Sequence, residues 1–113
     1  MKTSVEVVEQ WFAENREALT SGGRSVSIRS FKSLDAEKGK VSISLETQKI
    51  LASVTLWNLL RQITVIALDQ MTNETHVLVD RALFPEEEIV PLLNRIFHQI
   101  AAEPPSFAAI QGP

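Results

Sequence analysis

Two histidines and a small number of acidic clusters are the side chains of this sequence that could do chemistry. Histidine supplies general acid–base catalysis or metal ligation when a second ligand or a carboxylate lies at a suitable spacing. His76 falls in an expected strand and His98 in an expected helix, and no HxxxH or HExxH pattern surrounds either of them. We therefore interpret both histidines as surface or packing residues.

The remaining chemical signals also fail to form a catalytic pattern. The glutamates at positions 86–88 would point in three directions on a helix, and we interpret them as a solvated first turn. Gly22 and Gly23 end an expected helix, whereas a phosphate-binding loop needs glycine before one. Asp69 and Asp80 flank a strand without an acid–base partner, and there is no cysteine. The sequence predicts a protein that is not an enzyme and needs no metal or cofactor.

Length and charge predict a single acidic domain. The chain has 113 residues with 44% hydrophobic content, which suits one compact core. Eleven basic residues against fourteen acidic ones leave a net charge of −3. This balance disfavours nucleic acid as a partner, because phosphate binding requires clustered Lys and Arg.

Neither the apolar run in the middle of the sequence nor its N-terminal stretch predicts membrane association. The run from Leu51 to Leu68 carries Arg61 as its one charge, but Ser53, Thr55 and other polar residues fall in its middle. A membrane-spanning helix keeps such groups away from its centre. The N-terminal stretch MKTSVEVVEQWF has acids and no apolar core of a secretory signal. We expect a cytoplasmic protein that does not bind membranes.

The same run alternates with a period of two and predicts a β-hairpin. With a turn at residues 58–61, apolar residues meet on one face and polar ones on the other. The expected pairs are Leu56 with Ile63, Val54 with Val65, Ala52 with Ala67, Thr55 with Thr64, and Trp57 with Gln62. A one-residue slip would expose the apolar face, so the pattern specifies its own register.

Three further segments predict strands of the same sheet. Residues 40–46 alternate in phase with the hairpin, and a turn at 47–49 brings Leu45 against Ala52. Residues 24–30 and 76–80 complete a five-stranded antiparallel meander. In the last strand the length of the preceding turn leaves two choices open: either Val77 and Val79, or Leu78, face the core.

A helix is expected at each end of the sheet. Thr3 and Glu6 have the spacing of a capping box, and Gly22 and Gly23 stop the first helix. Its apolar stripe is Val8, Trp11, Phe12, Ala18 and Leu19. The second helix has an apolar seam of Ile89, Leu93, Ile96 and Ile100. Pro91 leaves two possibilities, an irregular first turn or a helix that begins at Pro91 itself.

These elements predict an α+β fold in which helices pack on at least one face of the meander. Residues 1–103 are expected to form a single α+β domain, since no linker or internal repeat divides them. The two prolines at 104 and 105 end the second helix, and residues 104–113 are expected to be a flexible C-terminal tail.

The surface carries the functional signals that remain. Residues 4–19 and 70–88 have net negative charge, which would steer a basic protein partner. Residues 24–40 are net positive, and we interpret Lys32, Lys38 and Lys40 as protection of a sheet edge.

The hairpin tip carries apolar residues at a position that should face water. The tip either folds back onto a helix or meets a partner, since tryptophan, arginine and aliphatic side chains are typical of interface hot spots. The predicted partner-binding residues are Thr55, Trp57, Asn58, Leu59, Leu60, Arg61, Asp69, Glu74 and Asp80.

Several motifs in order along the chain resemble the TriTu family of bacterial immunity proteins. They are the helix pattern W-x3-N-x3-L at Trp11, Asn15 and Leu19, the strand KVSISLET, the segment ASVTLW ending at Trp57, the strand QITVIALD and the terminal helix. The similarity covers about residues 7 to 100.

The resemblance implies a small cytosolic antidote to an Rhs-type toxin delivered by type VI secretion. Such a toxin is an ADP-ribosyltransferase that modifies the translation factor EF-Tu. The protein is then expected to form a heterodimer with the toxin's catalytic domain and to occlude its active site. The alternative is an acidic secretion chaperone or adaptor, which would dimerise and bind an extended segment of an effector.

Overall fold

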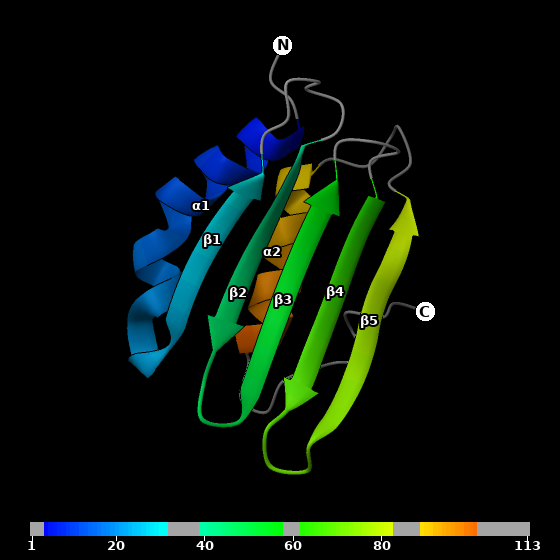
Figure 1. The fold of residues 1–113 in the computed structure, drawn as a ribbon. Coiled ribbons are helices and arrows are strands. Elements are labelled where there is room, and N and C mark those ends of the chain that lie inside the picture. Colours follow the sequence, from blue (N-terminus) through cyan, green and yellow to red (C-terminus); the bar gives the residue numbers. More distant parts are fainter. Residues whose placement is uncertain (1–3, 32–38, 58–61, 83–88, 102–113) are drawn as a thin grey trace.

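The computed structural model describes residues 4–31, 39–57, 62–82 and 89–101. Two helices and a short 3-10 turn bracket five strands (Figure 1). The elements are α1 (Ser4–Thr20), η1 (Ser21–Gly23), β1 (Ser25–Phe31), β2 (Lys40–Glu46), β3 (Ile50–Trp57), β4 (Gln62–Asp69), β5 (Glu74–Ala82) and α2 (Ile89–Ala101).

The five strands form one antiparallel sheet in the order β1-β2-β3-β4-β5, which confirms the predicted meander. The β3–β4 register pairs Leu56 with Ile63 and Thr55 with Thr64, as the alternation predicts. The β2–β3 register pairs Leu45 with Ala52, also as predicted. Buried residues of β2, β3 and β4 alternate with partly or fully exposed ones, so the binary pattern and the register agree.

A β-bulge in β5 resolves the alternative that the sequence left open. Val65 pairs with Val79 and Ile66 pairs with Val77, so Leu78 is the extra residue of the bulged strand. Leu78 and Val79 are both buried, whereas Val77 is 55% exposed. One inserted residue therefore lets two consecutive apolar side chains reach the core.

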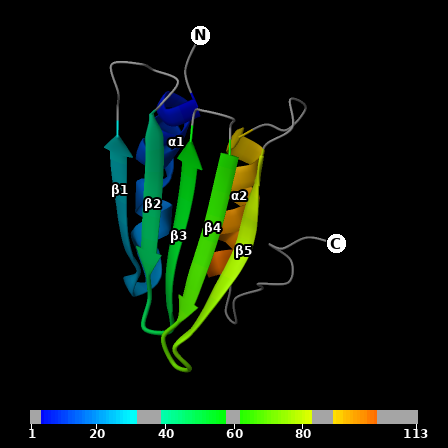
Figure 2. The same cartoon turned by 45° about the vertical axis from the view of Figure 1, so that its right-hand side comes forward.

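Both helices cover the same face of the sheet (Figures 1 and 2). The buried side chains of α1 and α2 form one cluster with the inward-facing residues of β2, β3, β4 and β5, and Val26 and Ile28 of β1 pack against it. Trp11 of α1 joins the two helices: its ring lies 5.2 Å from that of Phe97, and its Nε1 donates a hydrogen bond to Asn94 Oδ1 at 2.8 Å. Neither of the two described helices lies on the opposite face of the sheet (Figures 1 and 2).

The stripe predicted for α1 is correct except at Ala18, which is exposed. Val5, seven positions before Phe12, is buried instead, as the 3.6-residue period allows. The helix ends at Thr20, and Gly23 adopts φ +79°, a conformation that glycine tolerates without strain. The Arg24 guanidinium donates hydrogen bonds to the carbonyls of Leu19 and Ala18, both at 3.0 Å, and so satisfies the helix end.

Helix α2 begins at Ile89, so the possibility that it begins at Pro91 is wrong. Pro91 is the third helical residue, where a backbone N–H has no partner within the helix and its absence costs little. The seam is also wider than predicted, because Leu92 and Phe97 are buried beside Leu93 and Ile96. The predicted capping box at Thr3, the glutamates at 86–88 and the tail at 104–113 lie outside the described residues.

Candidate functional site

The sheet face turned away from the helices, here called the open face, is covered by neither α1 nor α2 (Figure 2). Because strand side chains alternate, every second residue of each strand projects onto it. Its members on β1 to β3 are Ser25, Ser27, Arg29, Phe31, Lys40, Ser42, Ser44, Glu46, Leu51, Ser53, Thr55 and Trp57. Those on β4 and β5 are Gln62, Thr64, Ile66, Leu68, Thr75, Val77, Asp80 and Ala82.

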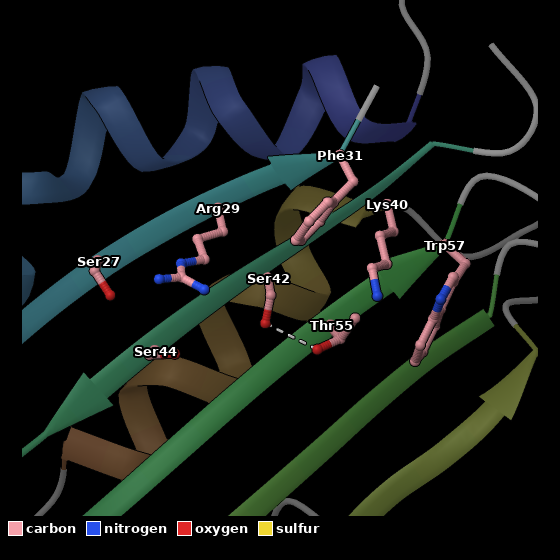
Figure 3. A pocket seen from close by; sticks show the side chains of 8 residues that line it. All are labelled: Ser27, Arg29, Phe31, Lys40, Ser42, Ser44, Thr55 and Trp57. Atoms are coloured by element: carbon pink, nitrogen blue, oxygen red, sulfur yellow. Dashed lines mark hydrogen bonds between the residues drawn. The ribbon is translucent and has the colours of Figure 1, made fainter. Parts of the chain in front are cut away.

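A groove of about 530 Å³ crosses the open face over β1, β2 and β3. Figure 3 shows its lining, with two aromatic rings at one end and a row of hydroxyls along its floor. The lining residues are Ser27, Arg29, Phe31, Lys40, Ser42, Ser44, Thr55 and Trp57, and they define the aromatic groove.

Strand pairing positions the two rings of the aromatic groove. Phe31 pairs with Lys40, and Lys40 pairs with Trp57, so the three residues form one row across three strands. Adjacent strands lie about 4.8 Å apart, which places the Phe31 and Trp57 backbones about 10 Å from each other. The Lys40 Nζ stands 4.8 Å from the centroid of the Phe31 ring, a cation–π contact.

The next row of the groove supplies a second cation and a pair of hydroxyls. Arg29 pairs with Ser42, which pairs with Thr55. The Ser42 and Thr55 hydroxyls are 2.9 Å apart and hydrogen-bond each other. Neither Arg29 nor Lys40 forms an ion pair with a residue of the described ranges, and the groove lining contains no carboxylate. The aromatic groove is therefore a positive region on a protein of net charge −3.

The other end of the open face is apolar. Leu51 pairs with Leu68, and Ile66 pairs with Val77 on the neighbouring strand. Leu51 is 40% exposed and Val77 55%, and Ile66 and Leu68 are partly exposed. These four residues define the apolar patch, which extends over β3, β4 and β5.

The structure brings only some of the predicted partner-binding residues together. Trp57 and Thr55 line the aromatic groove, and Asp80 lies in the same row as Thr55, two strands away. Asp69 and Glu74 pair with each other at the far end of β4, whose eight residues span about 23 Å. The other four predicted residues, Asn58, Leu59, Leu60 and Arg61, lie outside the described residues.

Two of the predicted acidic residues have intramolecular roles. Asp69 Oδ1 accepts hydrogen bonds from the backbone N–H groups of Met71 at 2.9 Å and Thr72 at 3.3 Å, which organises the β4–β5 turn. Asp80 Oδ1 accepts hydrogen bonds from Gln62 at 2.9 Å and Thr64 at 3.1 Å. The carboxylates of both residues therefore also contribute to holding the sheet.

Replacement of Asp69 by alanine is expected to lower the free energy of unfolding by about 0.5–1.5 kcal/mol, because two turn N–H groups lose their acceptor. Met71→Ala is the matched control, since this neighbouring side chain is 76% exposed. Urea unfolding followed by circular dichroism measures both variants. Equal stability of the Asp69 variant and the wild type would contradict this role in the turn.

Arg29, Phe31 and Lys40 line the aromatic groove but were not among the predicted partner-binding residues. The alternation of β1 predicts the side on which two of them lie. Because Val26 and Ile28 face the core, Arg29 and Phe31 face the opposite side of the sheet. The interpretation of Lys40 as edge protection is wrong: β2 lies between β1 and β3, and Lys40 faces the groove. The lysines at 32 and 38 lie outside the described residues.

The described residues contain no group of three or more His, Cys, Asp or Glu side chains that could hold a metal ion. The imidazole of His76 lies 3.8 Å from the Glu74 carboxylate, and His98 is an exposed residue of α2. Neither α1 nor α2, the helices in the part of the chain that is described, has the length and hydropathy needed to cross a membrane.

Comparisons of the chain with protein-family models, curated proteins and solved structures found no match.

Proposed function

We propose that this protein is an immunity protein that neutralises a toxin by binding its catalytic domain through the open face of the sheet. The observation that carries the proposal is the asymmetry of the fold: two helices bury one face, and the other face carries the aromatic groove at one end and the apolar patch at the other. The resemblance of several motifs to the TriTu family suggests the same partner class, an ADP-ribosyltransferase that modifies EF-Tu.

The composition of the open face suits a protein partner. Interfaces concentrate their binding energy in a few aromatic and arginine side chains, surrounded by contacts that exclude water. Trp57, Phe31 and Arg29 are residues of this kind, and the apolar patch would supply aliphatic contacts at the other end of the open face. In this mechanism the immunity protein does no chemistry. It covers the toxin's catalytic cleft and prevents the entry of NAD or of the target.

Charge would set the orientation of the partner on the open face. The aromatic groove is positive through Arg29 and Lys40, whereas Asp69 and Glu74 make the β4–β5 turn at the opposite end negative. A partner docked the wrong way round would meet like charges at both ends, which costs binding energy. The negative end would also speed the approach of a basic partner surface.

Coexpression with the toxin domain encoded beside this protein tests the proposal. Cells are expected to survive with the wild-type protein, and the two chains are expected to purify as a one-to-one complex. In vitro, EF-Tu modification should stop once the protein is equimolar with the toxin. Undiminished killing with no purified complex would refute the immunity function. A homodimer that binds an extended effector segment would instead favour the chaperone alternative.

A further inference from the structure

We infer that the aromatic groove receives an acidic segment of the partner protein, with a carboxylate held between Arg29 and Lys40 and an apolar side chain lying against Phe31 and Trp57. This inference rests on the proposed function, because it names the chemistry of the partner at the open face. It reverses the expectation from net charge, which would place only basic partner surfaces on this acidic chain.

The arginine, the lysine and the hydroxyl groups of the groove can all donate hydrogen bonds to an anion. The Arg29 guanidinium has a planar set of donors that matches a carboxylate, and Lys40 adds a second positive charge one strand away. The Ser42 and Thr55 hydroxyls carry two hydrogens and use one in their mutual bond, so the other can be donated to a ligand. No carboxylate among the lining residues competes for these donors.

The aromatic rings would strengthen the recognition of charge. Phe31 holds the Lys40 ammonium 4.8 Å from its ring centroid, and Trp57 closes the row on the other side. A segment lying along the groove would displace water between the rings, and ion pairs are stronger where water is excluded. The same rings offer apolar contact to the side chains that flank the acid in the bound segment.

Shape and charge favour a polypeptide over other anions. Small-molecule sites enclose about 70–90% of their ligand, whereas this groove lies on the outer surface of a sheet and is lined by side chains of β1, β2 and β3 alone. Two lysine or arginine side chains on a chain of net charge −3 are a poor match for nucleic acid, whose affinity scales with the number of phosphates neutralised. Ser44 of the groove pairs with Ser53, which pairs with Ile66 of the apolar patch, so a segment with acidic and aliphatic residues could contact both.

The first test uses charge reversal in the complex with the toxin domain. Arg29→Glu combined with Lys40→Glu is expected to weaken binding about 30-fold or more, because two cations at the groove become anions. The matched control combines Lys49→Glu with Arg95→Glu, which changes the net charge equally at exposed positions outside the groove, and it should change the affinity less than threefold. The neutral pair Arg29→Gln and Lys40→Gln should weaken binding about tenfold, and circular dichroism verifies folding of all variants.

The second test uses a probe that does not require the toxin. The chain has two tryptophans: Trp11 is buried and bonded to Asn94, whereas Trp57 lines the groove, so their indole N–H signals in ¹⁵N-edited NMR report separate places. A capped hexapeptide with the composition Glu-Asp-Phe-Asp-Glu-Leu is expected to shift the Trp57 signal saturably and leave that of Trp11 in place. The Arg29→Gln and Lys40→Gln variant should lose the response.

The outcomes separate the two proposals. Wild-type complex formation together with unchanged affinity of both groove variants would overturn the acidic-segment inference and leave the immunity function standing. Failure of the wild type to bind the toxin would refute the immunity function, and the peptide titration would then decide the chemistry of the groove by itself. An equal Trp57 shift with a lysine-substituted peptide, or with a dT8 oligonucleotide at physiological salt, would also overturn the inference.

Discussion

Replacement of Trp11 by alanine is expected to lower the free energy of unfolding by about 3–5 kcal/mol. The side chain is 4% exposed, packs 5.2 Å from the Phe97 ring and donates a hydrogen bond to Asn94. Its removal therefore opens a cavity between α1 and α2, the two helices that together cover the core. Domains of this size have a total stability of about 5–15 kcal/mol, so the variant would retain a small margin.

Two variants separate packing from hydrogen bonding at this position. Trp11→Phe keeps a ring beside Phe97, and Asn94→Ala removes the acceptor of a hydrogen bond worth about 0.5–1.5 kcal/mol. Both are expected to cost clearly less than Trp11→Ala. Urea unfolding followed by far-UV circular dichroism is the appropriate measurement, because fluorescence would change with the tryptophan itself. A loss below 1 kcal/mol for Trp11→Ala would show that the helix pair does not depend on this contact.

Replacement of Trp57 by alanine is expected to weaken binding to the proposed toxin partner by about 2–4 kcal/mol, at least 30-fold in Kd, while the protein remains folded. The ring stands at the end of the aromatic groove and is only partly buried, so its truncation removes interface area and leaves the core cluster intact. Isothermal titration calorimetry with the purified toxin domain measures the change.

The matched control for Trp57→Ala is Val90→Ala. Val90 is 40% exposed on α2, which covers the face of the sheet opposite the groove. Its truncation should leave the Kd unchanged, and Trp57→Phe should recover part of the lost affinity because a ring is retained. Equal affinities of the wild type and the folded Trp57→Ala variant would exclude this end of the open face from the interface.

The β-hairpin of β3 and β4 was predictable to the residue because two signals act together. Alternation specifies which side chains share a face, and pairing those faces allows one register, Leu56 with Ile63 and Val54 with Val65. The turn at residues 47–49 was equally clear, and Thr47 closes it by accepting hydrogen bonds from the N–H groups of Lys49 and Ile50.

Departures from regular periodicity were not predictable in the same way. The bulge at Leu78 adds one residue to β5, and nothing in the local alternation says whether the strand or the turn takes up that residue. Pro91 left a similar choice, between an irregular first turn and a helix that begins at Pro91. The structure resolves this choice, because α2 begins at Ile89 and Pro91 lies in its first turn. In both places the decision depends on packing against neighbouring elements.

The sequence by itself determined the element order, the meander and the division of each central strand into a core side and an open side, because these follow from the spacing of apolar residues along the chain. Only the tertiary structure decided which side chains come together on the open side and what surface they form. Arg29, Phe31, Lys40 and Trp57 come from three strands, and strand pairing with both helices on the other face makes them one positive, aromatic groove. Net charge is a sum over the chain and carries no information about such proximity, so an acidic protein can present a cationic groove.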